Sequence, residues 1–123
     1  MSTGKLLPKL ALVQGVFYLA TGIWPLVDID SFQAVTGPKH DLWLVRTVGV
    51  LVAVIGTVLV LSGRRQNIGA EIILLAIGSA LGLAAIDVFY VLNGTISPIY
   101  LADAGVELVL AAGWALAGRQ DSR

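Results

Sequence analysis

Four long apolar stretches constrain this chain more than any other feature of its sequence. They run over residues 9–27, 42–62, 68–92 and 99–118. A bilayer core of about 30 Å needs roughly 20 helical residues at about 1.5 Å each, so each stretch is long enough to span it. Transmembrane strands would be about 10 residues long with alternating hydrophobicity, which these continuous runs lack. The sequence therefore predicts an all-α integral membrane four-helix bundle, a single transmembrane domain over residues 1–123.

Composition indicates the same class of protein. Only 13% of the residues are charged and 57% are hydrophobic, whereas about a quarter of an ordinary soluble domain is charged. The expected partner is thus the lipid bilayer. The formal net charge is zero, without a Lys/Arg run that could follow phosphates, so nucleic acid is not an expected partner. The chain has no cysteine, which excludes disulfides, thiolate metal sites and dithiol redox chemistry. A redox role would need a bound cofactor or a partner's chemistry, and the sequence does not identify a cofactor.

The connection between the first two apolar stretches, residues 28–41, is the only long one. Ile29, Phe32 and Val35 recur in it at helical spacing. This spacing predicts a short interfacial helix, with Asp30 or Ser31 as its N-cap, and a solvated loop is the alternative. The only histidine, His40, lies in the same connection beside three aspartates, which falls short of a metal-ligand signature. No metal site is predicted.

Basic residues gather at one end of the predicted bundle. Four helices put both termini and the loop between the second and third helices on one side. That side holds Lys5, Lys9, Arg64, Arg65, Arg119 and Arg123. The opposite loops hold only Lys39, with Arg46 just inside the second helix. The positive-inside rule then predicts a multi-pass protein of the cell's inner (plasma) membrane with both termini cytoplasmic.

Ionisable residues from three of the helices lie in the outer half of the bundle. Arg46 and Asp87 each lie about one turn below the outer surface, as does Asp103, and Glu107 lies about two turns in. An unpaired charge at such depth costs several kcal/mol, so these groups should find partners. We expect one outward-facing buried polar pocket, closed by polar side chains of the first helix. Its candidate ligand-binding residues are Arg46, Asp87, Asp103, Glu107, Tyr18 and Gln14.

Two interpretations of this pocket stay open. In the structural one, Arg46 forms an ion pair with Asp87 or Asp103 that holds the helices together. Glu107 is then left over, as a protonated group hydrogen-bonded to Tyr18 or Gln14. In the functional one, Glu107 exchanges protons or binds a cation.

Small residues on two helices predict close packing. The second helix offers Gly49, Ala53 and Gly56 on one face, and the third offers Ala76, Ala80 and Ala84. Such faces let backbones approach in membranes. We favour packing of these faces against other helices of the same bundle. The alternative is that they form the contact between copies of the chain in a homo-oligomer.

Two segments of the first half carry a family resemblance. Phe32-Gln-Ala-Val-Thr-Gly-Pro38 is followed by Trp43-Leu-Val-Arg46-Thr-Val-Gly49 and a Gly-rich span. This arrangement resembles the small four-span bacterial membrane proteins called DoxX-like. Named members of that group are associated with membrane oxidoreductase complexes, so the resemblance implies an accessory or quinone-proximal role. It carries over no catalytic residue.

The sequence leaves three classes of function. The favoured one is a small bundle whose polar pocket binds a small polar or lipid-like ligand, or which serves as an accessory subunit of a larger membrane complex. The second is a proton-coupled small transporter. The third is a membrane-embedded isomerase or oxidoreductase subunit that uses Glu107 or Asp103 as general acid or base.

Overall fold

The computed structural model describes residues 3–121, with side chains over residues 6–119. Its helices are α1 (Thr3–Val27), α2 (Ile29–Thr36), α3 (Leu42–Arg65), α4 (Ala70–Leu92) and α5 (Tyr100–Asp121). The described range holds no strand, so the predicted all-α class is confirmed. All but α2 are long and apolar enough to cross a membrane. The side chains of Lys5 and Arg123, which contribute to the expected charge asymmetry, lie outside the described ones.

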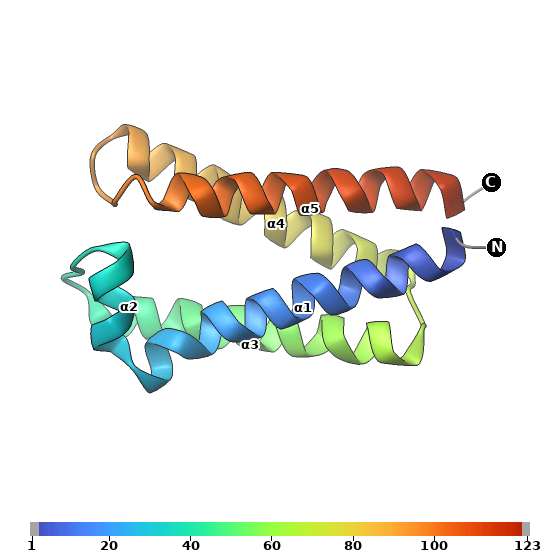
Figure 1. Cartoon of the computed structure of the whole chain (residues 1–123), viewed down its shortest axis with the longest axis horizontal. Helices are drawn as coiled ribbons and strands as arrows, with labels where there is room; N and C mark the ends of the chain where they lie inside the picture. Colours follow the sequence, from blue (N-terminus) through green and yellow to red (C-terminus); the bar gives the residue numbers. More distant parts are fainter. Residues whose placement is uncertain (1–2, 122–123) are drawn as a thin grey trace.

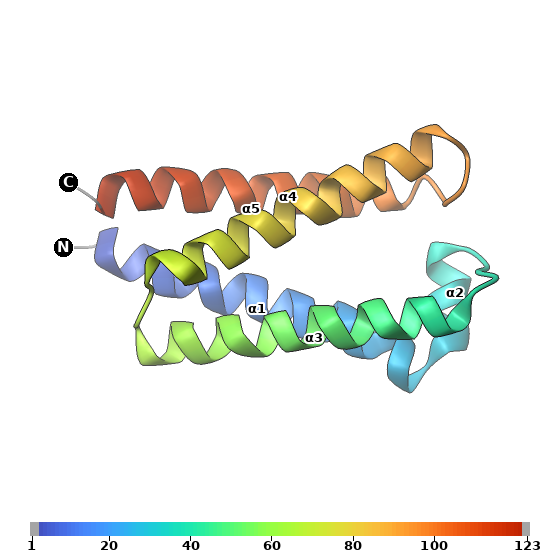
Figure 2. The same ribbon diagram turned by 180° about the vertical axis from the view of Figure 1, so that it is seen from behind.

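The long helices form two packed pairs, α1 with α3 and α4 with α5 (Figure 1). Helix α1 also packs against α5, whereas α3 and α4 touch little. Seen from behind, α4 runs obliquely, close to α1 and α3 at one end and beside α5 at the other (Figure 2). We call the end with Thr3, Asp121 and the 66–69 connection the terminal end. The opposite end, with α2 and the connections 37–41 and 93–99, is the loop end.

Three helix boundaries differ from the expected ones by three residues or more, and one of them is the end of α5 at Asp121. Helix α1 already begins at Thr3, so Pro8 lies inside it and removes one N–H near its start. Helix α3 continues past Gly63 to Arg65. Gly63 does not end the helix because it is buried against Leu12 of α1. The chain leaves the helix at Gln66, whose left-handed φ of 54° turns the following N–H, that of Asn67, back to the Ser62 carbonyl at 3.1 Å.

The predicted short helix in the long connection is present as α2. The expected N-cap is wrong: Asp28 caps it, its Oδ1 accepting from the Ser31 N–H at 3.2 Å, and Asp30 lies in the first turn. A cap must lie before the helix with its side chain turned back onto the first turn, and only Asp28 does so. Trp24 of α1 fixes α2 in place, because its Nε1 donates to Ser31 Oγ at 2.8 Å and its ring meets Phe32 edge-on.

Glycines let α1 and α3 touch backbone to backbone. A Cβ at Gly22 would lie 2.6 Å from the Gly49 carbonyl oxygen, and one at Gly56 would lie 2.7 Å from that of Gly15. The expected packing of Gly49 and Gly56 within the bundle is therefore confirmed. On α4, by contrast, Gly78 and Gly82 have nothing within 4 Å of a built Cβ and lie on the outside.

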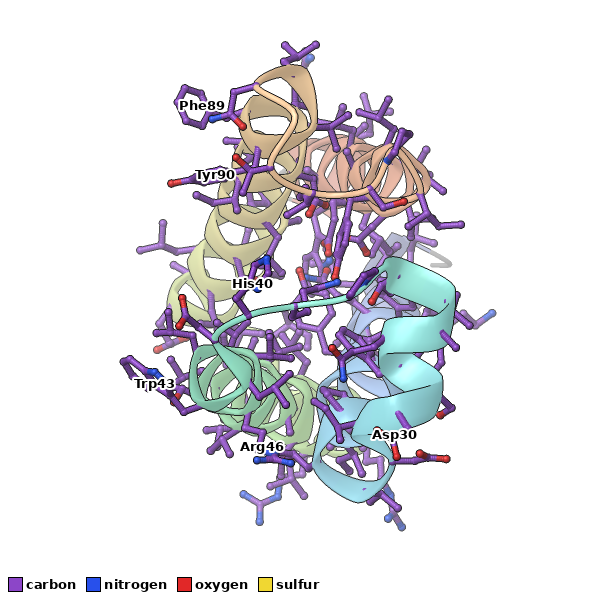
Figure 3. The ribbon with its side chains drawn as sticks, turned by 90° about the vertical axis from the view of Figure 1, so that its left-hand side faces the viewer. Asp30, His40, Trp43, Arg46, Phe89 and Tyr90 are labelled. Atoms are coloured by element: carbon purple, nitrogen blue, oxygen red, sulfur yellow. The ribbon has the colours of Figure 1, made fainter. Side chains whose placement is uncertain are left out.

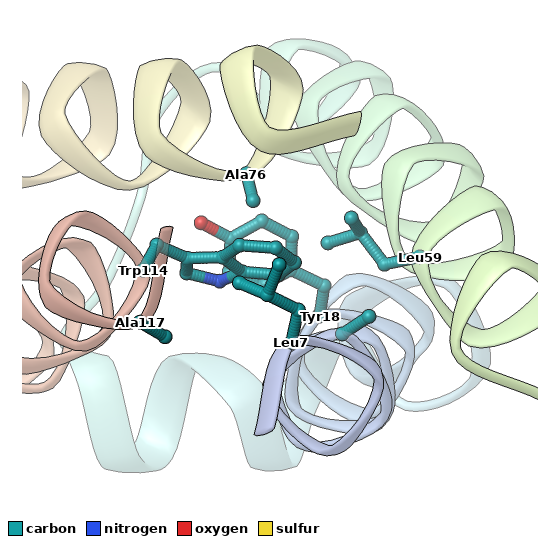
Figure 4. Packing of buried hydrophobic residues seen from close by; sticks show 7 residues of the cluster. Leu7, Tyr18, Leu59, Ala76, Trp114 and Ala117 are labelled. Carbon is teal, nitrogen blue, oxygen red and sulfur yellow. The ribbon is translucent and has the colours of Figure 1, made fainter. Parts of the chain in front are cut away.

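Buried apolar side chains fill the terminal half of the bundle (Figure 4). We call five of them the apolar plug: Leu7, Ala11, Leu59, Ala76 and Ala117. Each is at most 3% exposed. Many large apolar side chains instead point outward from all four long helices, as a lipid-facing surface requires.

Candidate functional site

Three acids from α4 and α5 meet inside the loop-end half of the bundle, and we call Asp87, Asp103 and Glu107 the carboxyl cluster. Asp103 lies within hydrogen-bonding range of both Asp87 and Glu107. A carboxyl group donates a hydrogen bond only when it is protonated, so a hydrogen bond between two of these groups would need a proton. Asp103 is half-buried, whereas Asp87 is 6% exposed and Glu107 1%. The sequence-based depth argument brought these three residues together correctly.

One oxygen of the carboxyl cluster has no partner. Asp87 Oδ2 is the buried side-chain oxygen without a hydrogen bond among the described residues. Leaving a buried polar atom unpaired costs about 1–3 kcal/mol, and buried polar atoms in native proteins are otherwise almost always bonded. The cluster is thus incomplete as the chain alone builds it.

Helix α1 closes the cluster from below through Tyr18. The Tyr18 hydroxyl donates to Glu107 Oε1 at 2.7 Å, and Tyr18 is fully buried. This is one of the contacts expected for Glu107. Gln14 does not bind Glu107: its Nε2 donates to the Ala76 carbonyl at 3.0 Å, and its Oε1 accepts from Trp114 Nε1 at 2.7 Å.

Gln14 therefore ties three helices together one turn deeper than Tyr18. Tyr18 is also within hydrogen-bonding range of Ser79 of α4 and of Gln14. We call Gln14, Tyr18, Ser79 and Trp114 the deep polar group. It joins the carboxyl cluster to the top of the apolar plug.

Arg46 does not belong to the site, and its expected place in the pocket is wrong. It is exposed, and in the view of the loop end its side chain points away from the bundle interior (Figure 3). No basic side chain contributes to the electrostatic surroundings of Asp87 or Glu107. The physical reason is the choice of helix partners. Because α3 packs on α1 and barely touches α4, Arg46 has no acid to face. The ion pair with Asp87 or Asp103 is therefore absent.

The loop end above the cluster is held by Lys39, which the sequence analysis did not single out. Its Nζ donates to Thr36 Oγ1 at 3.0 Å and to the Gly37 carbonyl at 2.7 Å. It also lies 5.1 Å from the ring centroid of Tyr100 and 5.6 Å from that of Phe32. Burial lowers the pKa of Lys39 from its ordinary value. The sequence signal that could have pointed to Lys39 is the presence of aromatic residues near the only lysine of the outer loops, because aromatic rings attract an ammonium group.

Tyr100 connects this loop-end group to the acids. It is within hydrogen-bonding range of Thr36, and Asp87 and Asp103 both lie within its electrostatic surroundings. A hollow of about 360 Å³ opens at the loop end. Its lining comes from the connections 37–41 and 93–99 together with Thr36.

A second, more open hollow of about 600 Å³ lies along the outside of α1 where it meets α2. Its walls are mainly the apolar side chains Val16, Leu19 and Ile23, with Asp28 and Ser31 at its loop end. It is separate from the carboxyl cluster, whose residues do not line it.

Among the described residues, no group of three or more His, Cys, Asp or Glu side chains could hold a metal ion. His40 is exposed at the loop end.

The geometry of the described residues defines a class for this protein. Its described part is a helical chain with four candidate membrane spans and a buried carboxyl cluster in the loop-end half. No protein-family model, curated protein or solved structure matches the chain. Function must therefore be argued from the site itself.

Proposed function

We propose that this protein is a small membrane binding protein whose carboxyl cluster exchanges protons for a small polar ligand that carries an ammonium group. The observation that carries the proposal is Asp87 Oδ2, a buried and unpaired oxygen beside two further carboxyl groups. Three ionised carboxylates without a cation would be prohibitively costly at this depth. The cluster is therefore neutral when it holds protons, and an ammonium group, which carries one positive charge and several N–H donors, can replace one of them.

We further infer that the protein lies in the bacterial inner membrane with both termini cytoplasmic. Arg64 and Arg65 end α3, and Arg119 lies near the end of α5, all at the terminal end. The positive-inside rule assigns that end to the cytoplasm. The carboxyl cluster then lies in the outer half of the membrane and takes its ligand from outside.

Proton-coupled transport is the second candidate. The series of hydrogen-bonding groups from Asp87 to Glu107 and Tyr18 favours it, since such a series lets protons move between sites. A role as accessory subunit of a membrane complex, a place among the DoxX-like proteins, and acid–base catalysis by Glu107 or Asp103 all stay predictions.

The test measures proton release when propylammonium chloride is added to the purified protein in weakly buffered nanodiscs. The probe presents an ammonium group with little else. We expect wild type to release protons, and Glu107→Gln and Asp87→Asn to lose that release. The matched control is Glu71→Gln, which changes an exposed acid at the start of α4 and should release as many protons as wild type.

Two outcomes would contradict the proposal. One is a wild-type protein that binds propylammonium without releasing protons or does not bind it at all. The other is equal release by wild type and Glu107→Gln, which would assign the protons to exposed groups.

A further inference from the structure

We infer that the carboxyl cluster is reached by water and protons only from the loop end, through a polar half-channel that the apolar plug closes toward the terminal end. The inference rests on the proposed function, because it states how the ligand and protons of that same site enter. It adds a direction of access, which the cluster alone does not specify.

Exposure falls steadily with depth along the polar side chains. Asp103 is half-buried, Asp87 is 6% exposed, Glu107 is 1% exposed, and Tyr18 and Gln14 are fully buried. Along α5, Asp103 lies about 4.5 Å below Tyr100 and Glu107 about 10.5 Å below it, at 1.5 Å per residue. Contact with solvent is therefore open near Asp103 and lost by Tyr18.

The hydrogen-bonding groups follow the same direction without a gap in the membrane interior. Asp87 meets Asp103, Asp103 meets Glu107, and Glu107 accepts from Tyr18. Below Tyr18, Gln14 donates to the Ala76 carbonyl and accepts from Trp114 Nε1. The polar series ends there, because Trp114 Nε1 only donates and cannot pass a proton onward.

Below the deep polar group the interior is apolar. Leu7 and Ala11 of α1, Leu59 of α3 and Ala117 of α5 meet there, each at most 3% exposed. In Figure 4 Leu7, Leu59 and Ala117 lie around Trp114 and Tyr18. A dry apolar layer of this kind blocks water and ions.

At the loop end the surroundings are polar instead. Thr36 lines the hollow there and is within hydrogen-bonding range of Tyr100, and Tyr100 lies in the electrostatic surroundings of Asp87 and Asp103. This gives a polar route from the hollow to the first carboxyl groups.

The charged and titratable groups around the route are few in the described part of the chain. Helix α1 contributes Tyr18, α4 contributes Asp87, α5 contributes Tyr100, Asp103 and Glu107, and the loop end contributes Lys39. Helix α3 contributes none, since Arg46 points away.

The test uses the cysteine-free chain to place single thiols above and below the deep polar group. Ala104→Cys on α5 lies next to Asp103, and Ala117→Cys lies in the apolar plug on the same helix; both alanines are buried. Each variant in nanodiscs, where both ends face water, is treated with a water-soluble trimethylammonium-ethyl thiosulfonate. The hydrated thiolate attacks the sulfur of such a reagent, forms a disulfide with it and releases a sulfinate. We expect Ala104→Cys to be modified and Ala117→Cys to remain unmodified over the same time.

A second pair of cysteine variants, on α4, repeats the test in case a variant on α5 fails to fold. Ala84→Cys lies near Asp87, and Ala76→Cys lies in the apolar plug. The same contrast is expected. Modification of both depths, of neither depth, or of the plug position alone would overturn the half-channel. Proton release by propylammonium in nanodiscs, where both ends face water, does not depend on the direction of access, so failure here is distinguishable from failure of the proposed function.

Discussion

Substituting Gly56 by alanine should separate α1 from α3 at the level of Tyr18. The new Cβ would lie 2.7 Å from the Gly15 carbonyl oxygen, 2.8 Å from the Leu19 amide nitrogen and 3.0 Å from the Tyr18 Cβ. Ordinary contacts begin at 3.4 Å, so the helices must part by about 0.7 Å, the difference between 3.4 and 2.7. The first two neighbours are backbone atoms and cannot turn aside. Overpacking of this kind costs about 1–3 kcal/mol.

The assay is equilibrium unfolding in mixed detergent–SDS micelles, followed by the fluorescence of the buried Trp114. The matched control is Gly82→Ala on α4, where a Cβ meets nothing within 4 Å. There alanine should be neutral or stabilise by up to about 1 kcal/mol through helix propensity. Because Gly56 packs on Tyr18, its variant should also weaken proton release by propylammonium. Equal unfolding free energies for the two variants would refute the close α1–α3 contact.

The remaining predictions concern single side chains. Arg46→Gln should change the unfolding free energy by no more than about 0.5 kcal/mol, because Arg46 is exposed. A loss of several kcal/mol would instead support a buried ion pair of Arg46. Gln14→Leu should cost about 1–3 kcal/mol in the same assay, since it leaves Trp114 Nε1 unpaired, whereas Thr57→Val, whose hydroxyl bonds only its own helix, should cost less. Burial lowers the pKa of Lys39, so the folded protein gives up this proton at lower pH than the unfolded chain and stability rises with pH just below the ordinary lysine value of about 10.4. Lys39→Met should abolish that rise and the exposed Lys9→Met should not, as SDS unfolding at several alkaline pH values would show; an unchanged rise in Lys39→Met would contradict it.

Hydropathy and length were enough to predict the helices, because each span must be apolar over about 20 residues whatever it packs against. Small residues on the second span were enough to predict one tight interface, since only glycine admits backbone contact at Gly49 and Gly56. Depth along each helix brought Asp87, Asp103 and Glu107 together, because depth follows directly from residue number.

The rotation of each helix about its own axis and the identity of its neighbouring helices could not be predicted in this way. Arg46 has the right depth, but it lies about 60° around α3 from Gly49, on a side that meets no acid. Which helices become neighbours depends on the pairing of α1 with α3 and of α4 with α5, and no local pattern encodes it. The Gln14–Trp114 contact, 100 residues apart in the chain, was missed for the same reason.

The central claim is that the carboxyl cluster holds protons when empty and releases one of them to solvent when an ammonium ligand binds. Infrared difference spectroscopy of the protein in nanodiscs tests it most directly, by recording the protonated-carboxyl C=O band before and after propylammonium is added. The account predicts that the band is present without the probe, decreases when the probe is added, and is altered in Glu107→Gln but not in Glu71→Gln. A band that the probe leaves unchanged, in a protein that nevertheless binds it, would contradict the claim.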